Sequence, residues 1–345
     1  MKDRKINRHF LFLFFTGILF CGFHVLSYCQ GRNADSLPIL FYNTENLFDC
    51  FDDTLKDDEE FLPDAVRRWN FKRYNDKVNR IAKVILASNG WEPPVLAGLC
   101  EVENDGVLKR LVWETGLSEA GYGFIHFESP DKRGIDAALL YRKDKFEVLS
   151  DSAVDVSDPD NDFFTRDILY VKGAALSDTF NVFVCHFPSK YGGVLSSEHR
   201  RVSVAEKLRS LCDSLLKIDE NSRIVIMGDM NESPGEKALS TVLKAGSREA
   251  GGSLTNLAFE LKADGVKGTV KYRGRWDVLD QIIVSRSLLD EPYRIEGMQV
   301  VELPFLLEQD EAYSGVRPFR TYLGPKFHGG FSDHLPVKVV LIKDH

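Results

Sequence analysis

Residues 223–234 read RIVIMGDMNESP, and the fold is organised around this stretch. Its apolar run, 224–227, is short and uninterrupted, which is typical of a strand buried on both faces. Gly228 ends the run, and Asp229 and Asn231 follow at once. A carboxylate and a carboxamide are therefore predicted on the rim of a rigid strand.

A helix start follows this polar pair. Ser233, Pro234 and Glu236 supply an N-cap, a first-turn proline and a capping-box acid, ahead of a helix expected through residues 239–243. The pair is thus expected in a tight strand-to-helix turn. Such turns are where proteins display catalytic groups.

Three other strand patterns end in residues that can bind a metal or move a proton. The patterns cover 36–43, 95–101 and 180–187, and the residues concerned are Asn43, Glu101 and His186. Asp333 and His334 open the final strand pattern, 335–342, and would share this rim if that strand runs antiparallel to a neighbour. A lone strand-end acid such as Glu101 also fits a solvated turn or a helix cap. Together these groups are of the kind that hold a hard divalent ion beside a phosphoryl group.

The histidines differ in their settings. His186 precedes a loop, 188–193, whose lysine and two glycines suit the approach of an anion, and His334 lies at a strand entrance. A buried histidine with satisfied hydrogen bonds is the alternative for either. Two others lie in the N-terminal segment, and four have no comparable setting: His126, His199, His328 and His345.

The order of elements predicts a mixed α/β chain. Strand, helix, strand and helix patterns alternate up to residue 112, and consecutive strand patterns over 122–187 then suggest antiparallel pairing. The acidic segment 151–162 does not match a calcium loop and is interpreted as a connection. A helix from Ser197 precedes the central stretch, and a long connection, 291–330, separates the last two strands.

The first thirty residues are interpreted as a secretory signal peptide. Basic residues precede the apolar run 10–26, and a polar segment follows from Gln30. A retained membrane anchor through 10–26 is the alternative, although this run is short for a span. Residues 31–345 are then expected to form a single domain in an exported protein, periplasmic or extracellular.

The net charge and the positions of the cysteines restrict the functions that the chain can have. Removing residues 1–30, which hold four basic residues and one acidic residue, changes the net charge from −8 to −11. Such an acidic chain is a poor candidate for coating DNA, although a local basic cleft remains compatible with it. Outside the signal, the cysteines at 100, 185 and 212 lie in apolar or helical patterns, where a buried thiol is expected.

Seven motifs, in this order, resemble the endonuclease/exonuclease/phosphatase superfamily. They are YNTENLFD (42–49), LCEVEN (99–104), GIDAALLYR (134–142), VCHFPSK (184–190), GDMN (228–231), WDVLDQIIVS (276–285) and SDHLPV (332–337). The match spans about residues 38–342. It implies a four-layer αββα sandwich, in which two mixed β-sheets pack face to face with helices outside.

The resemblance also implies roles for individual residues. Glu101 resembles the principal metal ligand, Asn43 a residue beside it, and Asp333 a residue close to the metal. Asp229 resembles the group that orients and deprotonates the attacking water, and Asn231 one that steadies the phosphate. The remaining implied members are His334, which resembles the phosphate-binding histidine, Asp280 as its partner, and His186 as a second active-site histidine.

The sequence allows more than one role for several other residues. Asp277 competes with Asp280 as the partner of His334, although the family position favours Asp280. Arg166 and Lys190 are candidate substrate-binding phosphate clamps or, equally, solvated surface charges. Asp136 in GIDAALLYR is a candidate supporting residue.

The sequence thus predicts a Mg²⁺-dependent phosphoesterase that uses activated water, with Mn²⁺ or Ca²⁺ as alternative cations. A nuclease-like phosphodiesterase is the first expectation. The alternatives are a phosphomonoesterase or a lipid-headgroup phosphodiesterase similar to sphingomyelinases, and, in another class, a non-catalytic calcium- or glycan-binding surface protein. The expected partner is a phosphoester substrate, with no obligate protein partner.

Overall fold

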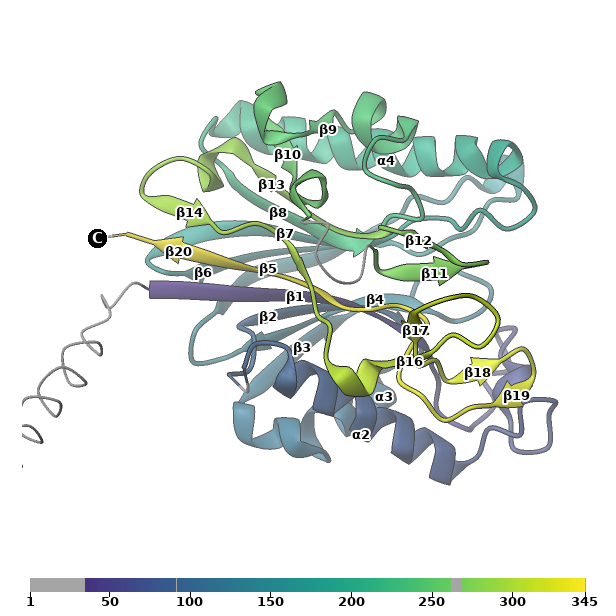
Figure 1. The fold of residues 1–345 in the computed structure, drawn as a ribbon. Helices are drawn as coiled ribbons and strands as arrows, with labels where there is room; N and C mark the ends of the chain where they lie inside the picture. Colours follow the sequence, from purple (N-terminus) through teal and green to yellow (C-terminus); the bar gives the residue numbers. More distant parts are fainter. Residues whose placement is uncertain (1–34, 91, 262–267, 345) are drawn as a thin grey trace, which may run out of the picture. The chain divides into compact units, whose positions relative to one another are not determined.

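The apolar strand patterns pair into two mixed sheets (Figure 1), as seen in a computed structural model that describes residues 35–90, 92–261 and 268–344. Within these ranges each sheet has seven strands. Sheet A runs β14 (Tyr293–Ile295), β20 (Val337–Lys343), β1 (Asp35–Leu47), β2 (Leu96–Val102), β4 (Asp136–Arg142), β3 (Tyr122–His126), and β15 (Gln299–Val300) also pairs with β20. Sheet B runs β5 (Glu147–Val154), β6 (Ile168–Ala175), β7 (Asp178–His186), β8 (Arg223–Asp229), β13 (Asp280–Ser285), β10 (Leu254–Asn256), β9 (Ala245–Gly246).

Helices cover the outer faces of both sheets. In Figure 1, α4 (Val194–Ile218) lies over sheet B, and α2 (Phe71–Ala87) and α3 (Asp105–Trp113) lie over sheet A. Asparagine, a favoured N-cap residue, begins both α2 and α3. The Asn70 side chain accepts from the Arg73 amide, and the Asn104 side chain accepts from the Val107 amide. The prediction of a four-layer αββα sandwich is confirmed.

Three apolar layers explain the uninterrupted strand patterns. In β1, Ile39 and Phe41 face the core between the sheets, whereas Leu40 and Tyr42 face the helices. The organising strand β8 divides its side chains in the same way between the inner core and the layer under α4. A strand with apolar neighbours on both faces needs no alternation of polar and apolar residues.

The two sheets approach closely at Gly98. A Cβ added there would lie 2.5 Å from the sulfur of Met227, which belongs to the facing sheet. This glycine therefore lets the central strands β2 and β8 pack directly against each other, a spacing that a side chain would prevent.

The connection 291–330, expected to be without strands, contains several short ones. Besides β14 and β15, it forms the hairpins β16 (Leu307–Gln309) with β17 (Val316–Pro318), and β18 (Tyr322–Leu323) with β19 (Lys326–Phe327). A further hairpin pairs β11 (Val270–Tyr272) with β12 (Arg275–Asp277). Strands of two or three residues are too short for an alternating pattern to reveal them.

The remaining helices are short. The one expected after Glu236 is a single π-turn, η5 (Ala238–Val242), although Glu236 does accept from the Ser233 amide at 2.5 Å as the capping box predicts. The others are 3₁₀ turns: η2 (Glu59–Phe61), η3 (Gly116–Ala120), η4 (Pro159–Asn161), η6 (Arg248–Ala250), η7 (Leu257–Glu260), η8 (Arg286–Leu288) and η9 (Pro304–Leu306).

The predicted signal peptide, residues 1–30, and the alternative anchor, 10–26, lie outside the described residues. Among the helices of the described part, none combines the length and apolar character required to cross a bilayer. Residues from Ser36 onward form one compact unit. The thiols of Cys100, Cys185 and Cys212 are free and buried, as the sequence predicted.

A buried ion pair stabilises the loop after β8. The Arg201 guanidinium on α4 lies 2.8 Å from Glu232, and both side chains are almost fully buried. Glu232 also accepts from the Ala238 amide at 3.0 Å. We expect Arg201→Ala to lower the free energy of unfolding by about 3–5 kcal/mol, because it leaves a buried carboxylate unpaired.

Urea denaturation checks this expectation. Lys237→Ala is the matched control, since its ion pair with Glu198 is exposed on the surface and should not change the midpoint. Equal midpoints for the two variants would contradict the stabilising role of Arg201.

Candidate active site

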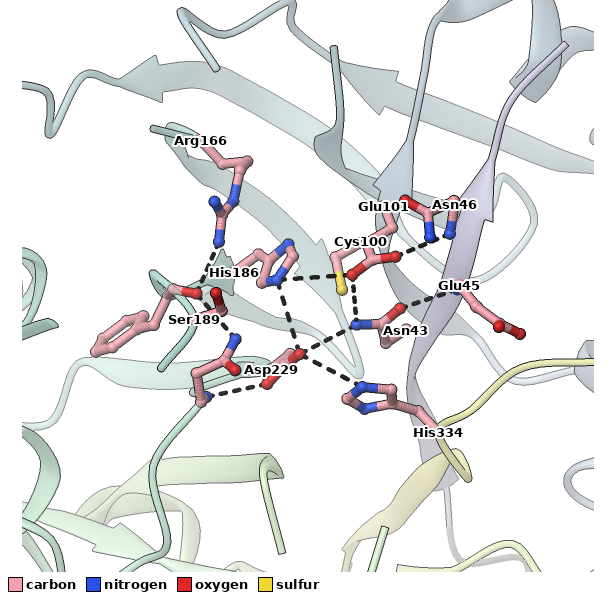
Figure 2. A network of polar contacts seen from close by, with 12 residues as sticks. Asn43, Glu45, Asn46, Cys100, Glu101, Arg166, His186, Ser189, Asp229 and His334 are labelled. Atoms are coloured by element: carbon pink, nitrogen blue, oxygen red, sulfur yellow. Dashed lines mark hydrogen bonds and ion pairs between the residues drawn. The ribbon is translucent and has the colours of Figure 1, made fainter. Parts of the chain in front are cut away.

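Strand register gathers the polar residues at one rim. His186, the last residue of β7, pairs with Asp229, the last residue of β8, and Asp229 pairs with Asp280, the first residue of β13. In the facing sheet, Asn43 pairs with Cys100, the residue before Glu101. The side chains of both sheets point toward a shared centre (Figure 2).

Glu101 and Asn43 approach this centre from irregular strands. The β1–β2 ladder shifts between Asn43 and Leu47, and Glu101 has a left-handed φ of 60°. Such bulges reorient side chains near functional sites. The Glu101 carboxylate accepts from the Asn46 amide at 2.8 Å and from the Asn43 Nδ2 at 3.3 Å. Its Oε1 also lies 4.0 Å from His186 Nε2.

Asp229 lies at the middle of the cluster. Its Oδ1 accepts from the Asn231 amide at 2.9 Å, and its Oδ2 accepts from the Asn43 Nδ2 at 3.0 Å. The same Oδ2 lies 3.7 Å from His186 Nε2 and 3.8 Å from His334 Nε2. Burial raises the pKa of Asp229 to about 6 against the opposing effect of His334.

His334 and Asp280 form a tight pair. The imidazole Nδ1 lies 2.7 Å from the buried Asp280 Oδ2, so Asp280 rather than Asp277 holds this ring. Burial alone would lower the pKa of His334, but the carboxylates of Asp280 and Asp229 outweigh it and hold that pKa well above its usual value. His334 is therefore a cation that points its Nε2 at Asp229.

His186 has the opposite character. Burial lowers its pKa well below the usual value, and the neighbouring Arg166 adds to this effect. Its Nε2 faces Asp229 at 3.7 Å and Glu101 at 4.0 Å, and its buried Nδ1 has no hydrogen-bond partner. The site thus combines one neutral and one charged imidazole around a single carboxylate.

The two candidate clamps already hold carboxylate partners. Arg166 is buried and donates to Asp131 at 3.1 Å and to the Phe187 carbonyl at 2.7 Å. Lys190 donates to both carboxylate oxygens of Glu236. The structure places Arg166 against the backbone that follows His186 and Lys190 further along that loop.

Asn231 and Asp333 lie at the edges of the cluster. Asn231 Nδ2 donates to the Phe187 carbonyl at 3.0 Å, and its backbone adopts a left-handed φ of 47°. Asp333 accepts from Arg320 at 2.7 Å, and the same arginine lies 3.5 Å from Glu45. The Asp333 carboxylate is therefore balanced by a cation from the 291–330 connection.

The sequence reasoning missed two supporting residues. Ser332 Oγ donates to the Asn43 carbonyl at 2.8 Å and accepts from the His334 amide at 3.1 Å, which links β1 to the histidine. Its position two residues before His334 is the pattern of a serine turn, a signal available in the sequence. Asn46 acts through its backbone amide, which no side-chain pattern reveals.

The donor set suits a hard divalent cation. The carboxylates of Glu101 and Asp229 both accept from the Asn43 Nδ2, whose own Oδ1 accepts from the Glu45 amide, and the place between the two carboxylates is the one that a cation would fill. Asp229, Asp280 and His334 have ligand atoms within 4.8 Å of one another. Carboxylate and amide oxygens are the ligands that Mg²⁺ and Ca²⁺ take.

The protonation states predict the pH dependence of any reaction that needs Asp229 as a base. Its pKa of about 6 means that the base is lost by protonation as the pH falls through 6, so kcat/KM should fall about tenfold per unit below that value. The raised pKa of His334 keeps its cation above neutral pH.

A kcat/KM profile from pH 4.5 to 9 tests this, with Asp280→Asn as the comparison. Asp280 is the group that most raises the pKa of His334. In the variant that pKa should be lower, so the fall in kcat/KM on the basic side of the profile should begin at a lower pH. A profile flat through pH 6 would contradict the base assignment.

Comparisons with known proteins agree with this geometry. A family model described as "Endonuclease/Exonuclease/phosphatase family" matches residues 38–343, whereas no curated protein matches the sequence. A family protein of that description from Bacteroides thetaiotaomicron is similar in structure, with 16% identity, a TM-score of 0.58, and coverage of 90% of this chain and 99% of that chain.

Two further structures are similar. One is a mannosyl-6-phosphatase from Bacteroides thetaiotaomicron, with 16% identity, a TM-score of 0.54, and coverage of 88% of this chain and 99% of that chain. The other is D. rerio TDP2 complexed with single-strand DNA product, with 15% identity, a TM-score of 0.51, and coverage of 89% and 99%. At these identities the likeness shows the fold alone.

Proposed function

Because the chain belongs to the endonuclease/exonuclease/phosphatase family, we propose that it is a cation-dependent phosphoesterase that hydrolyses phosphodiester bonds in a nuclease-like reaction. The observation that carries this proposal is the convergence on Asp229 of one charged and one neutral imidazole, together with Glu101 and Asn43. These groups come from both sheets. Asp280 holds His334, the Asn46 amide donates to Glu101, and the Glu45 amide donates to the Asn43 Oδ1.

Asp229 is the proposed base. A carboxylate with a pKa of about 6 is ionised at pH 7 yet basic enough to accept a proton from water in the transition state. The Asn231 amide holds its other oxygen at 2.9 Å, which fixes the direction of the lone pair.

His334 is the proposed group that stabilises charge on the phosphate oxygens. It is cationic, oriented by Asp280 at 2.7 Å, and does not need to reorganise when negative charge develops. His186, neutral because of burial, is available to share a proton with a phosphate oxygen through a ring nitrogen.

Glu101 and Asn43 would hold the divalent cation, with Asp333 nearby. A cation bound there neutralises charge on the phosphate and lowers the barrier to attack. Mg²⁺ is the first choice because the available donors are oxygens, and Mn²⁺ and Ca²⁺ are the alternatives.

A cleft next to His186 supports a substrate that extends beyond the scissile phosphate. It has a volume of about 640 Å³, and its lining includes Arg166 and Ser189, which lie near His186 in Figure 2, and Pro188, which precedes Ser189 in the chain. Its other cationic and aromatic lining residues are Lys132, Arg133, Arg200, Phe163, Phe164 and Tyr191. The exposed rings among them are Phe164 and Tyr191, and cations beside exposed aromatic rings form the kind of surface that binds single-stranded nucleic acid.

A phosphomonoester or a phosphorylated lipid headgroup is the second candidate. The net charge of −11 beyond residue 30 weakens non-specific attraction to nucleic acid, and acids at 60, 131 and 162 also line the cleft. The relationship in fold to a mannosyl-6-phosphatase is compatible with this alternative.

Hydrolysis by the purified protein tests both candidates. Single- and double-stranded DNA, RNA, bis-p-nitrophenyl phosphate, p-nitrophenyl phosphate and sphingomyelin would each be assayed with Mg²⁺ and with chelator. Mg²⁺-dependent release of nucleotides supports the nuclease-like reaction. Release of phosphate or phosphocholine alone supports the second candidate.

Glu101→Gln is the matched variant. It keeps the size of the side chain and an acceptor for the Asn46 amide, so the protein should fold but should need far more Mg²⁺ for half-maximal activity. A protein that hydrolyses none of these substrates, in which Glu101→Gln changes nothing, would instead fit a non-catalytic binding protein. We further propose export to the periplasm or the exterior, which cleavage near residue 30, read by N-terminal sequencing, would support.

A further inference from the structure

A second group of potential metal ligands lies at the end of the β3–β4 hairpin. Its members are His126, the last residue of β3, Glu128 in the following loop, and Asp136, the first residue of β4. His126 pairs with Ala138, so Asp136 is its diagonal neighbour on the same face of the hairpin. The ligand atoms of the three residues lie within 4.8 Å of one another.

The group contains two buried polar atoms without a hydrogen-bond partner. The side chains of His126 and Asp136 are only 2% and 1% exposed, and neither His126 Nε2 nor Asp136 Oδ2 has such a partner. These two atoms face each other at 3.5 Å. Two ligands of a tetrahedral zinc ion lie about 3.3 Å apart, given bonds of about 2.0 Å.

The opposite side of each residue is already held. His126 Nδ1 lies 3.1 Å from Asp105 on α3, and Asp136 Oδ1 accepts from the Ser129 amide at 3.1 Å. A histidine that gives one ring nitrogen to a carboxylate presents the other as a metal ligand, which is the usual arrangement around bound zinc. The two atoms without a hydrogen-bond partner, His126 Nε2 and Asp136 Oδ2, are therefore the ones that point toward each other.

The surroundings are rich in negative charge. Burial, together with the neighbouring carboxylates of Asp155 and Asp136, raises the pKa of Asp167 to about 6. Lys56 is the nearby cation, and its ammonium donates to the carbonyls of Ser129 and Asp131. Burial would lower the pKa of His126, but the carboxylates of Asp136, Glu128 and Asp105 that face its ring raise it overall.

We propose that His126, Glu128 and Asp136 form a second metal site, separate from the catalytic cluster, that takes a divalent transition-metal ion such as Zn²⁺. One imidazole and two carboxylates suit Zn²⁺ better than Mg²⁺, which prefers an all-oxygen shell with several waters. Because Glu128 is exposed, an ion can reach the site from solvent on that side. The ion would join the two ends of the loop 127–135. This loop carries Asp131, which accepts from Arg166.

Zinc binding in the presence of excess Mg²⁺ tests the site without any activity assay. The full-length protein, stripped with chelator, is loaded with ZnCl₂, passed through a desalting column, and its zinc content is measured by mass spectrometry. One Zn²⁺ per chain should remain on the wild type. Asp136→Asn, which keeps the shape and an acceptor for the Ser129 amide, should weaken the zinc Kd by at least about 100-fold.

Glu128→Gln is the second variant, chosen because an exposed side chain tolerates replacement without unfolding; it too should lose the ion. Asp105→Ala, which removes the partner of Nδ1 but no ligand, should weaken the zinc Kd by about 10- to 100-fold. The matched controls, Glu101→Gln in the catalytic cluster and the exposed Glu147→Gln on β5, should each retain one Zn²⁺. The proposal is overturned if the wild type retains no Zn²⁺, if Asp136→Asn and Glu128→Gln retain it, or if Glu101→Gln loses it.

Discussion

Replacing Asp229 by Asn is expected to lower kcat/KM by about 10²- to 10⁴-fold, the range found for loss of a positioned general base. Asparagine has the same shape and can still accept from the Asn231 amide, which Asp229 holds at 2.9 Å. It cannot accept a proton from water at neutral pH. The effect should therefore appear mainly in kcat, with little change in KM.

The stability of this variant separates a chemical role from a structural one. Asp229 is buried, and its raised pKa means that the folded state disfavours the charged form. Removing that charge should not lower the free energy of unfolding at pH 7. Asp151→Asn, an exposed acid on β5, is the matched control and should leave activity unchanged. A fall in stability of Asp229→Asn that accounts for the lost activity would contradict the base assignment.

His334→Ala is expected to lower kcat/KM by about 10²- to 10³-fold, the loss typical of removing one preorganised charge stabiliser. It should also abolish the basic side of the pH profile, because that side reports deprotonation of this imidazole. Asp280→Asn should reduce kcat/KM less, since the ring remains but loses its orientation and part of its positive charge.

A double-mutant cycle tests the coupling of the two residues. If Asp280 acts through His334, the loss in the double variant should equal that of His334→Ala rather than the sum of both. Additive losses would show that Asp280 acts independently of His334. His328→Ala, at a histidine paired with Glu308 on the β16–β17 hairpin, is the matched control for deletion of an imidazole.

The sequence predicts that the side chains of the site lie together, because the ends of apolar strands can be recognised in it. Asn43, Glu101, His186 and Asp229 each close or follow an apolar run, and the structure brings all four to one rim. What the sequence could not show is how they approach one another. The left-handed φ of Glu101 and the shift in the β1–β2 ladder depend on pairing with a strand some fifty residues away.

The hairpins of residues 291–330 and the site at His126 were less accessible to sequence reasoning. Short strands stabilised by tertiary packing leave no periodic signal. His126 ends an ordinary strand, β3, and its acidic neighbours are apparent only in the folded chain, where the β3–β4 turn brings Asp136 to it and α3 brings Asp105. The spacing along the chain, with nine residues between His126 and Asp136, resembles no metal motif.

The place of the final strand has a consequence for biosynthesis. In sheet A, β20 lies between β14 and β1, so β1 lacks its neighbour on that side until β20 has left the ribosome, although β2 already covers its other side. Residues Asp333 and His334 emerge just before that strand. The nascent chain therefore exposes one edge of β1 until β20 has emerged, and the cluster around Asp229 lacks His334 until nearly the same stage. A stop codon shortly before residue 333 should yield an inactive, aggregation-prone product even though over nine-tenths of the chain has been made.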